Sequence, residues 1–409
     1  MKKILKHINK CRSCYSLKLI KVYHNNPSPI GESFLEKKNI NLSTNKKYPL
    51  NLMICINCKF AQLDNIVDSD VVYKDYLYTT TSSPGLIDHF KKASSVIISK
   101  LKLKKNSKIL DIGSNDGSLL SFFKKKGHDV LGVEPAGPAS KLSKLKGINT
   151  IVSFFDNDLV KKINLTHGKF DLILANNVFA NIDDINSWIL NIKNLLDDNG
   201  SFVFESSYLL DVVKNQVFDF IYHEHLSYFS MTSVQNLCKR HGLFLFDYDH
   251  ISTKGGSIRY YISKNRNISK KVYKLIDKEK KFKLFNKETY KKLKIKINVA
   301  KKNIQNFIKS KNNLIGFGAS ISCITLIYEF NLENKFSILV DDNKIKENKF
   351  SPGSQIKVLS PKKITITKKD IILILPWRFQ KKIIKKHKSL LKKAGSVIQV
   401  WPKFKKMKL

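Results

Sequence analysis

Between residues 108 and 207 the chain alternates short apolar runs with amphipathic segments, and no other feature restricts its fold as strongly. The runs "KILDIG", "DVLGVEP", "INTIVS", "FDLILANN" and "SFVFES" have the length and composition of buried strands. The segments "GSLLSFFKKKG", "AGPASKLSKLKG" and "INSWILNIKNLLDDNG" have helical spacing. Strands that alternate with helices form parallel sheets covered on both faces, so we predict a doubly wound, Rossmann-like α/β domain, closed by one more strand in "GGSIRYYISK".

A second alternating stretch, from "NNLIGFGAS" to "DIILILPW", predicts a smaller Rossmann-like α/β domain near the C-terminus. Residues 269–311 are rich in lysine and carry apolar residues at helical spacing, which predicts one or two long amphipathic helices. A chain of 409 residues is long enough for several domains. We expect three, over residues 1–75, 76–267 and 268–409.

Four of the six cysteines occur as two C-x2-C pairs, Cys11 with Cys14 and Cys55 with Cys58. Two such pairs supply four thiolates, the tetrahedral ligand set that zinc prefers, so they predict a zinc-binding N-terminal domain; redox-active thiols are the alternative. Because a four-cysteine site leaves no open position for a substrate, we expect the metal to be structural. The remaining Cys238 and Cys323 are expected to be inert core thiols.

The formal net charge is +41, from 74 basic and 33 acidic residues. Such an excess attracts polyanions, and a basic zinc protein that binds nucleic acid is one alternative function. The lysines are spread along the whole chain together with many Ile and Asn residues, as A/T-rich codons produce, so we expect neither nucleic acid nor membrane as partner. A nucleotide diphosphate suits the charge equally well. Without a long apolar run or a signal-like start, we expect a soluble, cytoplasmic protein.

The turn after the first predicted strand reads "DIGSNDG", which places Asp111, Gly113 and Gly117 in a D-x-G-x-x-x-G pattern. Glycines let the backbone approach a ligand closely, and the following helix offers unpaired N–H groups. A carboxylate at this turn disfavours the pyrophosphate of a dinucleotide and favours a cofactor with a sulfonium and an amino group. The pattern therefore predicts S-adenosylmethionine, with NAD as the alternative.

Three further residues complete the predicted cofactor site. Glu134 ends the second strand, twenty-three residues after Asp111, where an acidic side chain accepts hydrogen bonds from ribose hydroxyls. Phe155 is expected to cover the adenine ring. Asn176 lies at the carboxyl end of a strand, where open α/β sheets bind their ligands.

The stretch "YHEHLSYFS", from Tyr222 to Ser230, collects proton-handling groups between apolar residues. Methylation of oxygen or nitrogen needs at most one base. Methylation of carbon needs a base that removes a proton beside a carbonyl, and donors that hold the enolate. Tyr222, His223, Glu224 and His225 are groups of these kinds.

These motifs, together with "LGVEPAGPAS" and the C-terminal "GFGAS", "VDDN", "PGSQIKVLSP" and "LILPW", resemble the sugar C-methyltransferases that act on nucleotide-linked 4-keto deoxyhexoses. The resemblance covers essentially the whole chain in order. It implies a zinc-bearing N-terminal domain, an S-adenosylmethionine domain and a Rossmann-like C-terminal domain around one active site, and it implies a nucleotide-linked keto sugar as the substrate.

Carried onto this chain, the resemblance implies that His225 is the base that enolises the keto sugar. Tyr222 and Glu224 would bind substrate and handle protons, and Tyr76, in "KDYLYTTTS", would reach into the same site. The C-terminal domain would cradle the nucleotide through the two glycines of "GFGAS", Gly316 and Gly318.

The chain departs from that family at two positions. Where the family carries a histidine, this chain has Asn181 in "FANIDD", and the family's lysine after its Gly-rich turn is missing from "GFGASISC". An amide can form hydrogen bonds but cannot shuttle a proton near neutral pH, so Asn181 is expected to bind rather than to titrate. An O- or N-methyltransferase on the same scaffold is the second alternative function. Asp183 and Asp184 are expected to cap a helix, and Tyr228 and Phe229 to pack as readily as to take part in chemistry.

Overall fold

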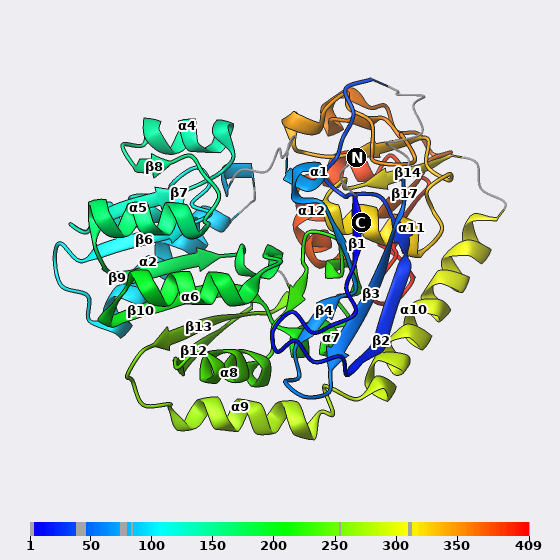
Figure 1. Cartoon of the computed structure of the whole chain (residues 1–409). Coiled ribbons are helices and arrows are strands. Elements are labelled where there is room, and N and C mark those ends of the chain that lie inside the picture. Colours follow the sequence, from blue (N-terminus) through cyan, green and yellow to red (C-terminus); the bar gives the residue numbers. More distant parts are fainter. Residues whose placement is uncertain are drawn as a thin grey trace.

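The computed structural model describes residues 4–37, 46–73, 80–82, 85–252, 255–309 and 313–408, so Tyr76 lies outside the described residues. The described chain forms a seven-stranded, a six-stranded and a four-stranded sheet and a two-stranded ribbon (Figure 1). We call the parts built on the seven-, six- and four-stranded sheets the central, C-terminal and N-terminal domains.

The central sheet has the strand order β12-β13-β10-β9-β6-β7-β8. Its five parallel strands confirm the predicted α/β fold. Beyond β10 the sheet continues with two antiparallel strands, β13 and then β12. The sequence predicted β13 but not β12. The strands are β6 (Lys108–Ile112), β7 (Asp129–Val133), β8 (Asn149–Ile151), β9 (Phe170–Asn176), β10 (Leu196–Ser207), β12 (Phe244–Ile251) and β13 (Ser257–Ser263).

Successive residues of the parallel strands point into two different cores. Ile109 and Leu172 pack under α2 and α3, and their neighbours Leu110 and Ile173 pack under α5 and α6. This double burial explains why the strands are apolar runs rather than alternating patterns. The helices are α2 (Leu86–Leu101), α3 (Ser118–Lys124), α4 (Gly137–Leu145), α5 (Asn157–His167), α6 (Ile185–Leu195), α7 (Leu209–Lys214) and α8 (Met231–Arg240). Of these, α3, α4 and α6 match the predicted helical segments, whereas α5, α7 and α8 were not predicted.

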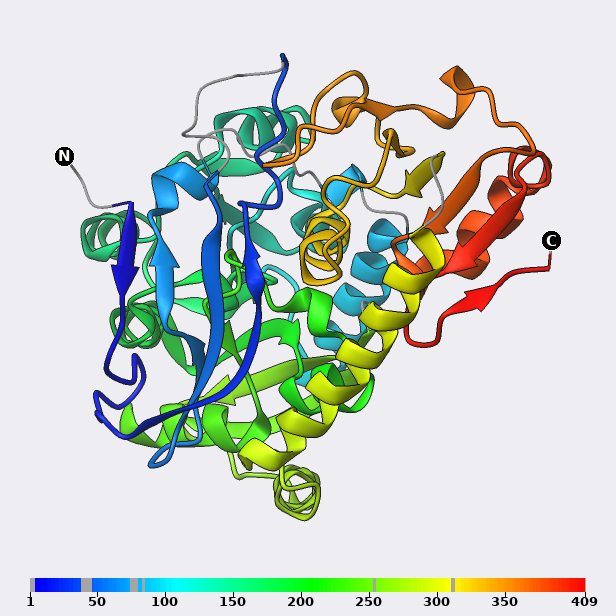
Figure 2. The ribbon, with the colours of Figure 1, turned by 90° about the vertical axis from the view of Figure 1, so that its right-hand side faces the viewer.

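The N-terminal sheet has the order β11-β4-β3-β2, and its edge strand β11 (Ser227–Tyr228) comes from the distant stretch "YHEHLSYFS". β11 pairs antiparallel with β4, Ser227 opposite Gln62 and Tyr228 opposite Ala61. The long blue strands of this sheet are seen face on in Figure 2. The other elements are β1 (Leu5–His7), β2 (Leu19–Ser28), β3 (Tyr48–Cys55), β4 (Ala61–Leu63), β5 (Asn65–Val67) and α1 (Ser69–Tyr73).

Two amphipathic helices, α9 (Lys270–Lys281) and α10 (Lys287–Ile308), lead from the central to the C-terminal domain, in line with the predicted helical segment. The C-terminal sheet has the order β16-β15-β14-β17-β18-β19 and is parallel except for β19, which confirms a second α/β unit. Its elements are β14 (Leu314–Phe317), α11 (Ile321–Glu329), β15 (Ile338–Val340), β16 (Val358–Leu359), β17 (Ile371–Ile374), α12 (Gln380–Lys386), α13 (Lys388–Leu391), β18 (Ser396–Gln399) and β19 (Lys405–Lys406).

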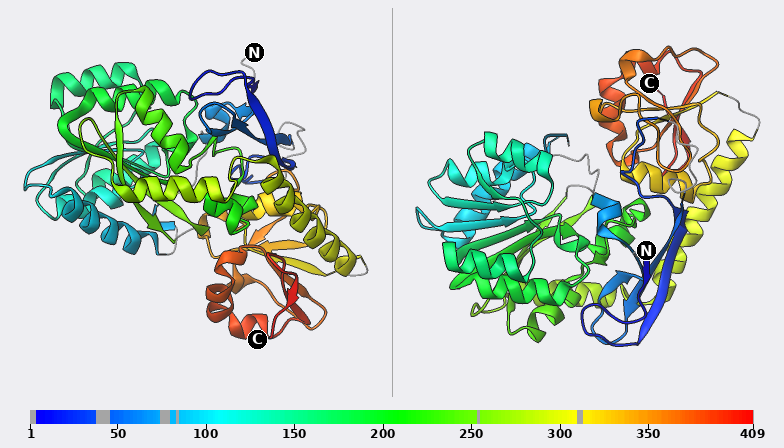
Figure 3. Two further views of the ribbon diagram at one scale, coloured as in Figure 1. Left: turned by 90° about the horizontal axis from the view of Figure 1, so that it is seen from below. Right: turned by 45° about the horizontal axis from the view of Figure 1, so that its top comes forward.

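The N-terminal strands contact both other domains (Figures 1 and 3). β2 packs against α10 and α11, and β4 pairs with β11 of the central chain segment. The stretch that carries most of the expected catalytic residues therefore lies where the three domains meet. Among the described residues, no helix combines the length and the apolar character that crossing a membrane requires.

Candidate active site and metal centre

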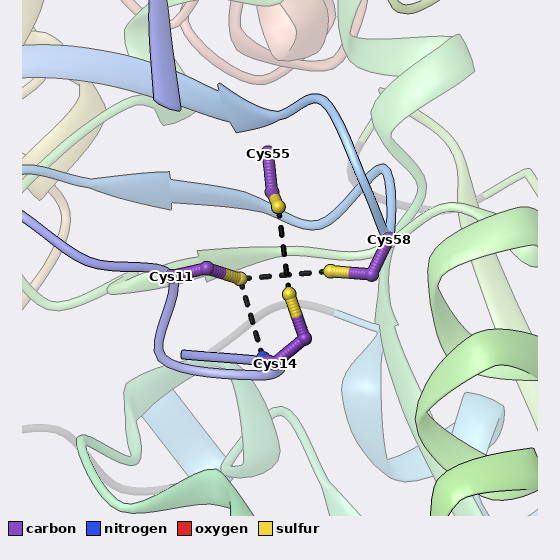
Figure 4. A group of neighbouring side chains, drawn as sticks. All are labelled: Cys11, Cys14, Cys55 and Cys58. Carbon is purple, nitrogen blue, oxygen red and sulfur yellow. Dashed lines mark hydrogen bonds between the residues drawn. The ribbon is translucent and has the colours of Figure 1, made fainter. Parts of the chain in front are cut away.

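The four paired cysteines converge on one point of the N-terminal domain (Figure 4). Their Sγ atoms all lie within 4.8 Å of one another, with Cys11 3.5 Å from Cys58 and Cys14 3.5 Å from Cys55. Tetrahedral zinc with Zn–S bonds of about 2.3 Å places its sulfurs roughly 3.8 Å apart, so the cluster fits that ion with little adjustment. Cys238 and Cys323 are buried elsewhere, as expected.

The predicted cofactor turn follows β6. Gly113 and Gly117 have φ values of +71° and +69°, which side chains disfavour, and a Cβ on Gly113 would come within 2.4 Å of Val178. The carboxyl group of Asp111 is buried, and burial together with the nearby charge of Glu134 raises its pKa to about 8. A buried acid beside another acid is a favourable place for a positively charged ligand.

Glu134 lies directly after β7, and burial raises its pKa. Its two carboxylate oxygens accept the backbone N–H groups of Asn115, at 2.9 Å, and Ala136, at 2.8 Å. These contacts fix the side chain and leave two of its four lone-pair positions for other donors, such as ribose hydroxyls. The structure therefore brings Asp111 and Glu134 together at the carboxyl ends of the neighbouring strands β6 and β7.

Asn176 ends β9 at the same end of the sheet, and its Oδ1 atom is buried with no hydrogen-bond donor among the residues that the structure describes. A buried amide oxygen without a donor marks a place where a ligand would supply one. Phe155 packs edge-to-face on Trp188, with ring centroids 5.2 Å apart, inside the central core. Its expected contact with an adenine ring stays a prediction.

The catalytic candidates Tyr222 and His225 face each other. The phenol oxygen lies 3.1 Å from Nε2 of the imidazole, and the two ring centroids are 4.3 Å apart. Burial, with the charge of nearby Glu224, raises the pKa of Tyr222 well above its ordinary value. The phenol therefore stays protonated, and it can donate this hydrogen bond when Nε2 of His225 carries no proton.

The neighbours of this pair have different surroundings. His223 lies 3.1 Å from the carbonyl oxygen of Tyr48, and burial lowers its pKa to about 4, so it faces the N-terminal sheet as a neutral side chain. Glu224 is buried. Tyr228 donates to the carbonyl of Phe220 at 3.3 Å, and Phe229 lies in the core. These contacts favour packing for Tyr228 and Phe229.

The segment after β9 carries the residue that departs from the resembled family. Asn181 ends a short helix, η3 (Phe179–Asn181), that packs beside β11, and its Oδ1 atom is buried without a donor among the described residues. Asp184 caps α6 by accepting the N–H of Ser187 at 3.0 Å, as expected. Asp183 instead pairs with exposed Lys6 at 3.2 Å.

Sequence reasoning missed a buried ion pair that joins the C-terminal domain to the catalytic stretch. Arg378 contacts Asp219 at 2.9 Å and stacks over Phe220, 4.0 Å from the ring centroid. Trp377 donates to the same carboxylate at 3.1 Å. Asp219 begins the turn that leads to Tyr222, so the C-terminal domain contacts the catalytic stretch directly. Trp377 and Asp219 lie 158 positions apart in the sequence, so no local pattern predicts their contact.

A second missed cluster lies at the end of β10, beside Asn176. His89 and Arg259 each donate a hydrogen bond of 2.8 Å to the carboxylate of Glu205. Burial would raise the pKa of Glu205, but its hydrogen bond from His89 and the charge of Arg259 outweigh burial and lower the pKa. A cluster built from three separate elements has no signal in any one of them.

Three families match consecutive parts of the chain. Residues 11–73 match a zinc binding domain, residues 87–246 match a methyltransferase domain, and residues 252–402 match the C-methyltransferase C-terminal domain. The chain is also 26% identical over 406 residues to the C-methyltransferase NovU of Streptomyces niveus, a match that covers 97% of this chain and 96% of that protein.

Two solved structures each match less than half of the chain. An S-adenosylmethionine-dependent methyltransferase of Clostridium acetobutylicum is 18% identical, with a TM-score of 0.36, and covers 44% of this chain and 94% of its own. The magnesium protoporphyrin IX methyltransferase of Synechocystis is 12% identical, with a TM-score of 0.34, and covers 44% of this chain and 80% of its own.

Proposed function

Because the chain belongs to the S-adenosylmethionine-dependent C-methyltransferases with a zinc-binding N-terminal domain, we propose that its acceptor is a nucleotide-linked 4-keto deoxysugar and that His225 is the base. The observation that carries the proposal is the partly buried pair of Tyr222 and His225, with 3.1 Å between phenol oxygen and Nε2. We also propose that the three domains span residues 1–75, 76–267 and 268–409.

The chemistry required is the formation of a carbon nucleophile. Nε2 of His225 takes the proton from the carbon beside the keto group, and the electron pair of the broken C–H bond becomes the enolate. The phenol of Tyr222, kept protonated by burial, then turns its hydrogen bond from the imidazole to the enolate oxygen. S-adenosylmethionine, when bound, supplies the electrophilic methyl group that this carbon accepts.

Cofactor and sugar each have proposed binding residues. Asp111 and Glu134 would hold the positively charged and ribose parts of the cofactor, Gly113 and Gly117 would let the backbone approach it, and Asn176 would accept one of its hydrogen bonds.

On the sugar side, the buried Oδ1 of Asn181 would accept a hydroxyl, which an amide can do without titrating. Glu224 would line the same pocket, since its charge acts on Tyr222.

The nucleotide is proposed to lie on the C-terminal domain. Of the two glycines expected to cradle it, Gly318 has a φ of +112° and lies against Pro376, where a Cβ would approach to 2.5 Å. The neighbouring N–H of Ala319 donates to Asp341 at 2.7 Å and is thus occupied. Arg378 of this domain contacts Asp219 and Phe220 beside the catalytic stretch, which supports the view that the diphosphate binds on that side.

The test is deuterium exchange at carbon. The protein is incubated with a nucleotide-linked 4-keto-6-deoxyhexose in D2O, with and without S-adenosylmethionine, and the sugar is analysed by mass spectrometry against a protein-free control. We expect protein-dependent deuterium uptake without cofactor and a product heavier by one methyl group with it. Methyl transfer without exchange would indicate an O- or N-methyltransferase. Neither reaction, with cofactor binding intact, would exclude this sugar class.

A further inference from the structure

Arg12 occupies an unusual place, between the two cysteines of the first zinc knuckle and yet fully inside the protein. Its guanidinium donates to the carbonyl oxygens of Ile182, at 2.8 Å, and Asp183, at 3.3 Å. It also donates to the carbonyl oxygen of Leu226 and, at 2.8 Å, to the hydroxyl of Ser227. One side chain thus contacts two loops that lie more than forty residues apart in the sequence.

Both loops carry proposed substrate-binding residues. Ile182 directly follows Asn181, and Leu226 directly follows His225. A shift of either loop relative to the other would change the distance between the base and the amide that is proposed to bind the sugar. Geometry of this kind has large effects on rate, because a displacement of about 1 Å can cost roughly 10²-fold.

The backbone of Arg12 is held as firmly as its side chain. Its N–H donates to the side chain of Gln62 at 2.8 Å, and its carbonyl accepts from Asn186 at 2.7 Å. Gln62 lies opposite Ser227 in the pairing of β4 with β11, and Asn186 lies in the first turn of α6. The knuckle, the edge of the N-terminal sheet and the start of α6 are therefore joined at this one residue.

We propose that Arg12 is a positioning residue that holds the loop at 181–183 and the loop at 225–227 at one fixed separation, so that the zinc knuckle sets the geometry of the catalytic pocket. This inference rests on the proposed roles of His225 and Asn181. Arginine suits the task because its planar fork presents five donors in fixed directions, and here it reaches four acceptors. Lysine, a single point of charge, cannot span both loops.

The test compares Arg12→Lys and Arg12→Gln with a matched control, Arg240→Gln. Arg240 donates to the hydroxyl of Ser13 in the same knuckle. For each full-length protein, zinc content, cofactor affinity, kcat and KM are measured, together with backbone amide exchange by mass spectrometry. Peptides that cover residues 181–184 and 222–228 report the two loops.

We expect both Arg12 variants to retain zinc and cofactor affinity, to exchange faster in the two reporting peptides, and to lose kcat by about 10²-fold with little change in KM. Arg240→Gln should match the wild type in all five measurements. Loss of zinc from Arg12→Lys would overturn the proposal, because Arg12 would then serve the knuckle itself. Unchanged exchange in both peptides would overturn it as well.

The exchange measurement needs no sugar, so it separates this proposal from the proposed function. Faster exchange in the two loops with an inactive wild type would leave the positioning role standing and reject the substrate. An active wild type with unchanged exchange in the Arg12 variants would support the substrate and reject the positioning role of Arg12.

Discussion

The phenol oxygen of Tyr222 and the Nε2 atom of His225 lie 3.1 Å apart, and both residues belong to the turn that leads into β11. In the proposed reaction, the phenol would pass from His225 to the enolate oxygen as His225 takes the proton.

Replacement of the base gives the most direct prediction. His225→Gln should lower deuterium exchange and methyl transfer by about 10³-fold, since it keeps a hydrogen-bonding side chain but removes the titrating nitrogen. Cofactor affinity, measured by calorimetry, should not change. The control is His223→Gln, because His223 faces the carbonyl of Tyr48 and glutamine can still donate there. Equal activity of the two variants would remove His225 from the role of base.

Cofactor binding should depend on pH through Asp111. Its pKa is about 8 in the free protein, so the group is mostly protonated at pH 7, whereas a cationic ligand favours the carboxylate. We therefore expect the affinity for S-adenosylmethionine to rise with pH up to about 8 and then to level off, with proton release at pH 7. Calorimetry in two buffers of different ionisation enthalpy measures that release. In Asp111→Asn the release should be smaller and the affinity lower, and an identical pH profile would contradict the assignment.

The N-terminal domain should depend on its metal. Cys58→Ser or a strong chelator removes one thiolate or the ion, and the knuckles at residues 11–14 and 55–58 then lose the bond that ties them together. We expect zinc loss together with faster amide exchange over β3, β4 and β11. Cys238→Ser, a buried cysteine outside the cluster, should keep one zinc per chain. A metal-free protein with wild-type exchange in these strands would speak against the zinc site.

Acid should destabilise the protein partly through His223. Its folded pKa of about 4 lies below the ordinary value of 6.5 because burial disfavours the imidazolium. The unfolded chain therefore binds more protons between these values, and the free energy of unfolding falls as the pH drops from about 6.5 to about 4. Urea midpoints of the wild type and His223→Gln should converge above pH 7 and show a shallower acid decline in the variant. Parallel declines would show that other groups cause the loss.

The sequence predicted the features that local patterns encode. The apolar runs around Leu110 and Ile173 predicted the parallel strands, because strands buried on both faces consist mostly of apolar residues. The spacing of Cys11, Cys14, Cys55 and Cys58 gave the metal cluster, because ligand spacing is itself a local property.

What the sequence did not predict depends on contacts between distant segments. β11 is only two residues long, too short for any periodicity, and it exists because Gln62 and Ala61 pair with it. Nothing in the sequence signalled the role of Arg12, since three of its four side-chain acceptors are backbone carbonyls, which any residue can supply. Helix α5 was not predicted because its apolar pattern is weak: only Leu159, Val160 and Ile163 are buried, among many polar neighbours.

The pairing of β11 with the N-terminal sheet also has a consequence for engineering. Exchange of domains between relatives assumes that each module brings its own active-site walls, but here residues 227–228 complete a sheet whose other strands lie before residue 64. A chimera that takes its first 75 residues from a relative would pair a foreign strand with the native catalytic turn. Transplanting a new specificity therefore requires that residues 4–73 and 218–230 be inherited together, as one unit.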